Sequence, residues 1–170
     1  MWVGRGGGGE GAGEWGVEVW ETETGQEAIT ISGNSKGVCG VSFSPDGKRI
    51  VSGGFDGIKV WDAETGQETL TIKGHSGNVT NVSFSPDGKR LAATSHARTV
   101  MKVGDMATGQ ETLTLKGHTE AVYSEAFSPD GTRLASARRD KTVKVGGVAS
   151  GQDTPTFNGH GEDSPRVRST

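Results

Sequence analysis

Two short patterns in this sequence match motifs that carry chemistry in other proteins. Glycines in the segment 6–11 have the spacing GxGxxG, which holds dinucleotide phosphates when a strand precedes it and a helix follows. His118 and Glu120 match the HxE pattern of zinc deaminases, whose metal also needs paired cysteines. We expect neither a strand before segment 6–11 nor a helix after it, and Cys39 is the single cysteine. The sequence therefore predicts no catalytic residue, no cofactor and no metal site.

A basic cluster lies between residues 138 and 144 of this acidic chain. We interpret it as a solvated turn and strand face, and contact with an anionic peptide or a phosphate is the alternative. Its members are Arg138, Arg139, Lys141 and Lys144.

The overall composition narrows the class of protein. The formal net charge of the 170 residues is −3, which gives no general attraction to nucleic acid or to an anionic membrane. No apolar run is long enough to span a bilayer, and the chain does not open on a signal peptide. One cysteine cannot form an internal disulfide, so we expect a soluble, cytoplasmic protein in a reducing compartment. The 29 glycines indicate many tight turns and hence many short strands.

Three markers recur along the chain with a common period of 41–43 residues. SPDG stands at 44–47, 85–88 and 128–131. TGQE stands at 24–27, 65–68 and 108–111, with SGQD at 150–153. GH stands at 74–75, 117–118 and 159–160, with GN at 33–34. A shared period in independent markers indicates a repeat architecture.

Each repeat is predicted to contain four short strands. In the first full repeat, apolar alternation predicts a strand at 38–44 with Cys39, Val41 and Phe43 on one face. The remaining strands of that repeat are expected at 49–54, 58–62 and 68–74. Pro, Asp and Gly in SPDG are typical of a tight turn between the first two strands. No segment has helical periodicity, so the predicted fold class is all-β.

A meander of four short strands, marked by GH and by Val60-Trp61-Asp62, resembles the WD40 repeat. The resemblance extends over roughly residues 17–160. The near-identical copies at 67–75 and 110–118 resemble bacterial WD40 arrays in particular. The resemblance implies a partial β-propeller of about three and a half four-stranded antiparallel blades, with fourteen strands in all. The expected organisation is a Gly-rich lead-in at 1–16, a half blade at 17–32, repeats at 33–73, 74–116 and 117–158, and a polar tail at 161–170. The lead-in is either a flexible segment or a decayed second strand of the first blade.

In that family a hydrogen-bonded tetrad of His, Ser or Thr, Asp and Trp ties each blade together, and this sequence retains only part of each tetrad. The retained residues are Ser52, Asp56, Trp61, His75, His118, Ser136 and Asp140. The replaced positions are Asn34, Ala93, Ala97, Gly104 and Gly146. Loss of a buried tryptophan removes about 3–5 kcal/mol of stability where the site cannot collapse.

Glu125 stands where the two earlier repeats have Val41 and Val82, on the face shared with Phe127. One hypothesis is a desolvated carboxylate with a raised pKa, suited to acid–base work. The other, which we favour, is sequence decay or an end blade that is open to water.

The resemblance implies a non-catalytic scaffold for protein–protein interaction that binds other proteins or peptides through a rim of loops. The candidate rim residues are Lys36, Phe55, Asn78, His96, Glu120 and Arg139. Three and a half blades cannot close a ring, so we expect a fragment of a larger propeller or self-association through unpaired strand edges. A degenerate fragment without independent function is the alternative, and a propeller enzyme is a more remote one.

Overall fold

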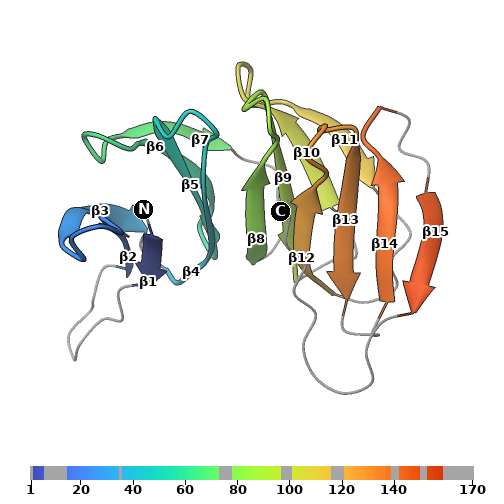
Figure 1. Cartoon of the computed structure of the whole chain (residues 1–170), viewed down its shortest axis with the longest axis horizontal. Helices are drawn as coiled ribbons and strands as arrows, with labels where there is room; N and C mark the ends of the chain where they lie inside the picture. The colour runs from blue at the N-terminus through green and yellow to red at the C-terminus, as the bar shows by residue number, and fades with distance from the viewer. Residues whose placement is uncertain are drawn as a thin grey trace.

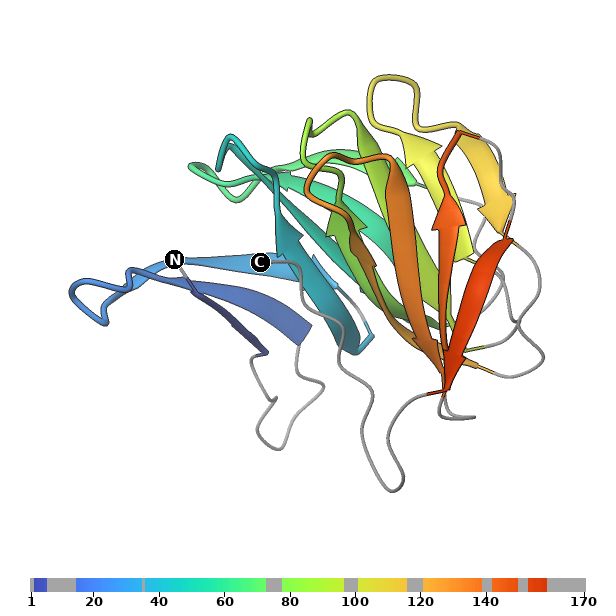
Figure 2. The ribbon, with the colours of Figure 1, turned by 45° about the vertical axis from the view of Figure 1, so that its right-hand side comes forward.

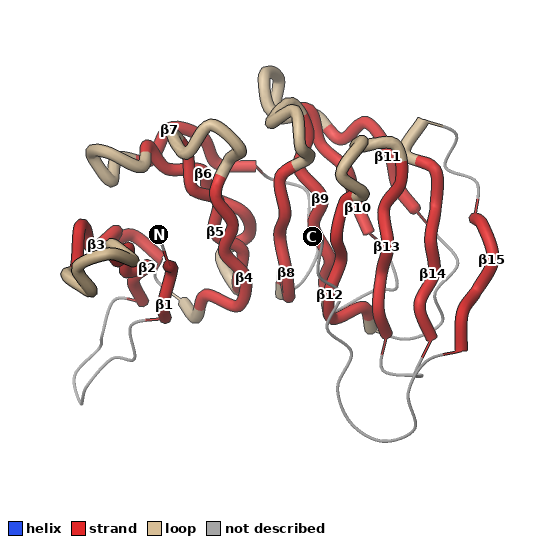
Figure 3. The backbone as a smooth tube through the Cα atoms, viewed as in Figure 1, coloured by secondary structure: helices blue, strands red, loops and turns tan. Residues whose placement is uncertain are grey.

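The computed structural model describes residues 2–5, 15–34, 36–72, 78–96, 101–115, 121–138, 142–149 and 153–158, and every regular element in these ranges is a strand (Figures 1 and 3). The strands are β1 Trp2–Arg5, β2 Trp15–Trp20, β3 Glu27–Asn34, β4 Val38–Phe43, β5 Arg49–Gly54, β6 Gly57–Asp62, β7 Glu68–Ile72, β8 Val79–Phe84, β9 Arg90–Ser95, β10 Met101–Asp105, β11 Glu111–Leu115, β12 Val122–Phe127, β13 Arg133–Arg138, β14 Thr142–Gly147 and β15 Asp153–Asn158. The predicted all-β class is confirmed. The described residues contain no helix of the length and hydropathy that a membrane crossing requires.

Consecutive strands form four antiparallel sheets. The first sheet is three-stranded (β1–β3), and the second (β4–β7), third (β8–β11) and fourth (β12–β15) have four strands each. The sheets follow one another in chain order from the blue N-terminal end to the red C-terminal end (Figures 1 and 2). The inner strands β4, β8 and β12 pack against one another in that order. These sheets have the arrangement of successive blades in a partial propeller.

Strand β1 agrees with the second reading of the lead-in, a decayed second strand of the first blade. It lies inside the segment 1–16 that was expected to be a lead-in, and it brings the strands of the described residues to fifteen rather than fourteen. It pairs with β2 over Trp2↔Trp20 to Arg5↔Val17, which is the place of the second strand of a blade. A strand thus does precede the glycines of segment 6–11, but the next element described is a strand and not a helix. Residues 6–14 and the predicted polar tail at 161–170 lie outside the described residues.

The SPDG segments form the turns that the sequence predicted. In the second sheet the hydroxyl of Ser44 accepts a hydrogen bond from the Arg49 backbone N–H at 2.9 Å, and the same atoms of Ser85 and Arg90 repeat this contact in the third. Gly47 has a φ of +70°, which is costly for a residue with a Cβ. Each turn therefore fixes the register between the first two strands of its sheet.

The buried apolar side chains form three separate cores, and each core lies between two successive sheets. Each contains side chains from two neighbouring sheets. The core between the first and second sheets holds Val17, Val19, Ile31, Val38, Ile50 and Trp61. The core between the second and third holds Val51, Ile58, Val60, Ile72, Val79, Val82, Phe84, Leu91, Ala93 and Met106. The core between the third and fourth holds Ala92, Val103, Leu115, Phe127, Leu134 and Val148.

Two arginines connect neighbouring sheets near the SPDG turns. The Arg49 guanidinium of the second sheet lies 5.7 Å from the centre of the Phe84 ring in the third sheet. In the next interface, Arg90 lies 5.9 Å from the centre of the Phe127 ring. Arg90 Nη2 also donates a hydrogen bond to the Gly131 carbonyl at 2.8 Å. The same polar and cation–π contacts therefore recur from one interface to the next.

A β-bulge interrupts the inner strand of the second, third and fourth sheets. The register shifts between Val38 and Gly40 in β4, and shifts at the same place occur in β8 and β12. The side chain of the bulged residue does not follow the alternation of inward and outward side chains along its strand. Cys39 is consequently exposed, which corrects the prediction that it shares the buried face of Val41 and Phe43.

Candidate interaction surface

The best preserved repeat keeps part of the predicted tetrad. The indole N–H of Trp61 donates a hydrogen bond of 2.8 Å to the hydroxyl of Ser52, and both side chains are buried. Asp56 accepts a hydrogen bond of 2.9 Å from the backbone N–H of Lys36, which joins the turn after β5 to the segment before β4. Trp61 therefore fixes the body of the second sheet, and Asp56 fixes its loop end. His75, His118 and Asp140 lie outside the described residues.

The third and fourth sheets have a glycine where the second sheet has Trp61. Two positions after that glycine, each has a larger residue than the second sheet has. Gly104 and Gly146 stand in the register of Trp61, and the residue two positions after Trp61 is Ala63. Met106 and Val148 take the place of Ala63, and both are buried in inter-sheet cores. In the fourth sheet, Ser136 is buried and its hydroxyl donates to the Lys144 carbonyl at 3.5 Å. These changes keep apolar atoms in the space beside each missing indole.

The candidate rim lies at the loop end opposite the SPDG turns. In the second sheet the Phe55 backbone N–H donates to the Gly37 carbonyl at 3.2 Å, and the Phe55 side chain is 59% exposed. In the third sheet the His96 backbone N–H donates to the Asn78 carbonyl at 2.9 Å. Lys36, Phe55, Asn78 and His96 thus occupy equivalent loops of neighbouring sheets. Glu120 and Arg139 lie outside the described residues.

Two further residues join the candidate rim, and sequence reasoning did not find them. Cys39 Sγ lies 3.7 Å from Asn78 Oδ1, which links the second sheet to the third. The rings of His96 and Tyr123 have centroids 5.8 Å apart at an interplanar angle of 52°, which links the third sheet to the fourth. Cys39 and Tyr123 are both bulged residues of inner strands. A bulge depends on strand pairing, so the sequence carried no direct signal for either residue.

The rim surface, defined by Lys36, Cys39, Phe55, Asn78, His96 and Tyr123, offers one cation, a thiol, an amide and aromatic rings. Such side chains bind a partner through stacking, apolar contact and hydrogen bonds. Within the described ranges, no group of three or more His, Cys, Asp or Glu side chains is placed to hold a metal ion.

Glu125 is buried between the third and fourth sheets, with 3% of its surface exposed, and not on an end face open to water. Its Oε2 accepts a hydrogen bond of 2.9 Å from the Thr94 hydroxyl. Thr94 in turn lies 3.0 Å from the hydroxyl of Thr80. Burial raises the pKa of Glu125 to about 8, since a charged carboxylate loses its hydration there. Glu125 Oε1 and Ser83 Oγ are buried without a hydrogen-bond partner among the described residues.

These neighbours correct the expectation that Glu125 stands on an apolar face. Phe127 is buried on the same face, as predicted, but Thr94 supplies a hydroxyl where the second sheet has Gly53. The raised pKa agrees with the first hypothesis for this residue. The described hydrogen bond of the carboxyl, from the Thr94 hydroxyl, joins the third sheet to the fourth, so the geometry supports a structural role.

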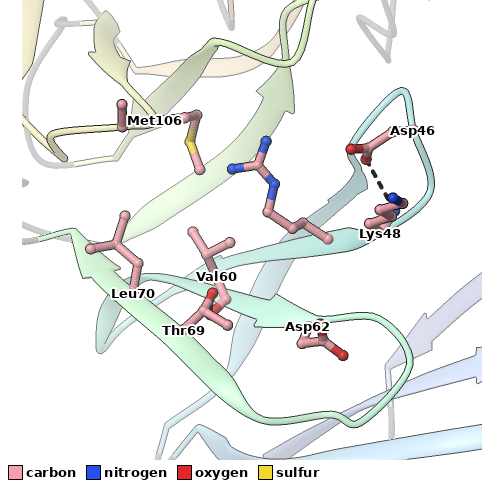
Figure 4. A pocket seen from close by; sticks show the side chains of 9 residues that line it. Asp46, Lys48, Val60, Asp62, Thr69, Leu70 and Met106 are labelled. Carbon is pink, nitrogen blue, oxygen red and sulfur yellow. Dashed lines mark hydrogen bonds between the residues drawn. The ribbon is translucent and has the colours of Figure 1, made fainter.

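An open groove of about 460 Å³ lies between the second and third sheets at the SPDG end (Figure 4). Val60, Leu70 and Met106 form its apolar floor. Asp46 and Lys48 of the SPDG turn stand at one side, where the Lys48 backbone N–H donates to Asp46 Oδ1 at 3.1 Å. The hydroxyl of Ser44 and that backbone N–H hold the pKa of Asp46 below its usual value. The groove is thus a wide cleft between two blades, and its two acidic residues, Asp46 and Asp62, each accept hydrogen bonds within their own turn.

Comparison with known families agrees with the period of these sheets. A family model described as WD domain, G-beta repeat matches residues 25–62, 66–101 and 109–145, which together make up more than half of the chain. Each matched segment begins near the last strand of one sheet and ends in the third strand of the next. The sequence repeat is therefore offset from the sheet, as the resemblance implied. No curated protein matches the chain.

Proposed function

Because the chain belongs to the WD40 repeat family, we propose that it is a non-catalytic platform that binds other proteins or peptides through the rim surface. WD40 repeats commonly mediate protein–protein interaction, and the family is typically non-enzymatic. The specific assignment of the rim as the binding surface, and of this chain as a scaffold, is our proposal.

The observation that carries the proposal is the continuity of the rim across three sheets. Cys39 meets Asn78, and His96 meets Tyr123, so side chains of the second, third and fourth sheets form one surface. Phe55 stands at one end of it with 59% of its surface exposed. Exposed aromatic side chains on a rigid scaffold are typical anchors of a protein interface. We also propose a cytoplasmic location, because an exposed free thiol at Cys39 suits a reducing compartment.

The single cysteine allows a direct test of the binding surface. A photo-activated cross-linker is attached to Cys39 of the full chain, which is then exposed to an extract of its own cells. The matched control carries Cys39→Ser and Lys89→Cys, which moves the label to the exposed turn between β8 and β9, at the opposite loop end. We expect a discrete cross-linked partner from Cys39 and not from position 89. The purified partner should then bind Phe55→Ser about tenfold more weakly than the unmodified chain.

Two results would overturn the proposal. Identical adducts from both label positions would indicate non-specific contact. No adduct from Cys39, together with no loss of binding for Phe55→Ser with any partner found by another route, would support a degenerate fragment without independent function.

A further inference from the structure

The fourth sheet leaves uncovered a face that is buried in every earlier sheet. Phe157 is 55% exposed, whereas Ile72 and Leu115, which take the same place in the second and third sheets, are 9% and 5% exposed. Phe157 pairs with Val143 in the same register in which Ile72 pairs with Ile58. The next sheet along the chain covers Ile72 and Leu115. The face of β14 and β15 therefore resembles the faces of the earlier sheets that the next sheet covers.

The first sheet has a complementary face that points away from the second sheet, and Ala28 and Thr30 of β3 are exposed on it. Val17 and Val19 of β2 are fully buried against the second sheet, so strand alternation places Glu18 and Trp20 on the opposite side. Trp20 stands in the register of Trp61, because Trp20 pairs with Glu27 as Trp61 pairs with Glu68.

The indole of Trp20 lacks the partner that the indole of Trp61 has. Trp61 donates to Ser52, but the register of Ser52 is occupied in the first sheet by Gly4, which has no side chain. The Trp20 Nε1 atom is buried and has no hydrogen-bond acceptor among the described residues. A buried N–H without an acceptor is costly.

We propose that two copies of this chain close head to tail, with the β12–β15 face of each copy packed on the β1–β3 face of the other. The three interfaces inside the chain indicate a second copy as the binding partner of this face. In each of them, this face of one sheet is covered by the opposite face of the next sheet. The first and fourth sheets lie at opposite ends of the row (Figure 1), so they do not meet within one copy. The four sheets of the described residues, taken from each of two copies, make eight blades, within the range of about four to eight in which propellers close.

The proposed contacts between the two copies differ in a single respect from the contacts between sheets of one chain. The first sheet has no strand in the place of β4, so the contact forms through β2, β14 and β15 without an inner strand on one side. The dimer is therefore weaker than the packing between sheets of one chain. Its population should depend on protein concentration, and it should dissociate on dilution.

Sedimentation velocity of the full chain over a range of concentrations tests this arrangement. We expect a species of twice 17.7 kDa that dissociates on dilution. Phe157→Glu should give a monomer at all concentrations, and Phe55→Glu, which changes an equally exposed phenylalanine on the rim, should leave the dimer intact. Trp20→Glu should also give a monomer. An equimolar mixture of Phe157→Glu and Trp20→Glu should recover a heterodimer, because one of its two contacts joins two intact faces.

That recovery also shows that both variants are folded. A monomeric unmodified chain at every concentration would overturn the proposal. A dimer that survives Trp20→Glu but not Phe157→Glu would indicate that two fourth sheets meet face to face instead. Assemblies larger than a dimer would show that the two faces do not close a ring of eight.

Discussion

Thr94 of the third sheet donates a hydrogen bond of 2.9 Å to Glu125 of the fourth, at a place where the preceding interface has Gly53 beside Val82. A Cβ on Gly53 would lie 2.5 Å from Val79 Cγ1 and 2.7 Å from Val82 Cγ1, so the two valines of the third sheet leave room only for glycine on the second. Threonine is accommodated opposite Glu125 because its hydroxyl bonds the carboxyl. The two residues at this position therefore act as a matched pair in each of these two interfaces.

The first prediction concerns this matching. At pH 5, Glu125→Val alone should lower the free energy of unfolding by about 1–3 kcal/mol, because valine then crowds Thr94 and the hydrogen bond is lost. Combining it with Thr94→Gly recreates the Gly53–Val82 pair. The double variant should be more stable than the sum of the single effects by about 1–3 kcal/mol in urea unfolding. Additive effects would contradict the pairing.

The second prediction is a pH dependence. Glu125 has a pKa of about 8 when buried and 4.5 when exposed, so the folded chain holds this proton more tightly than the unfolded chain. Its contribution to stability is complete below pH 4.5 and is lost as the pH rises towards 8, by roughly 1.4 kcal/mol per pH unit in that window. Glu125→Gln should not show this slope. Asp130, with its pKa lowered to about 2 by hydrogen bonds from Ser128 and Thr132, titrates below the window. Parallel curves for the unmodified chain and Glu125→Gln would disprove the assignment.

The third prediction separates the two roles of Trp61. Trp61→Ala should reduce the free energy of unfolding by about 3–5 kcal/mol, since it empties part of the core between the first and second sheets. Trp61→Phe keeps most of the apolar surface and leaves the buried Ser52 hydroxyl without its donor, so we expect a smaller loss of about 1–3 kcal/mol. An unchanged melting transition for Trp61→Ala would show that the first two sheets do not pack as described.

The fourth prediction concerns the missing tryptophan of the third sheet. A Cβ at Gly104 would meet only the Gln110 carbonyl, at 3.5 Å, so the backbone accepts a side chain there. Met106 is already buried in the adjoining core, and an added indole competes with it. Gly104→Trp should therefore lower the melting temperature, and Gly104→Trp with Met106→Ala should raise it above that of the single variant. Stabilisation by Gly104→Trp alone would mean that Met106 does not fill this space.

The repeated motifs predicted the local structure well, for physical reasons that act over a few residues. Pro, Asp and Gly in SPDG set the turn, and apolar alternation set the faces of strands such as β6 and β12. The sequence offered a decayed strand in the lead-in only as an alternative and did not locate β1, because Trp2–Arg5 is short and its glycine gives little strand signal. Its pairing with β2 is a tertiary effect.

The site was predicted less completely than the fold. Lys36, Phe55, Asn78 and His96 could be proposed from their positions in the repeat, and the structure places them on equivalent loops. Tyr123 could not, because its place beside His96 depends on a bulge that forms only when β12 pairs with β13. Contacts between sheets, such as that of Thr94 with Glu125, join residues 31 positions apart, and no local pattern encodes them.

The central claim is that the repeats pack as successive blades of one rigid platform, and amide hydrogen exchange measures this most directly. We predict slow exchange at the amides of the central strands β5, β9 and β13, which pair on both sides within their sheets. Trp61→Ala should speed exchange in the first and second sheets more than in the fourth, because Trp61 lies in the core between the first two. Rapid exchange throughout all three strands at neutral pH would contradict the account, since strands without packed neighbours cannot protect their amides.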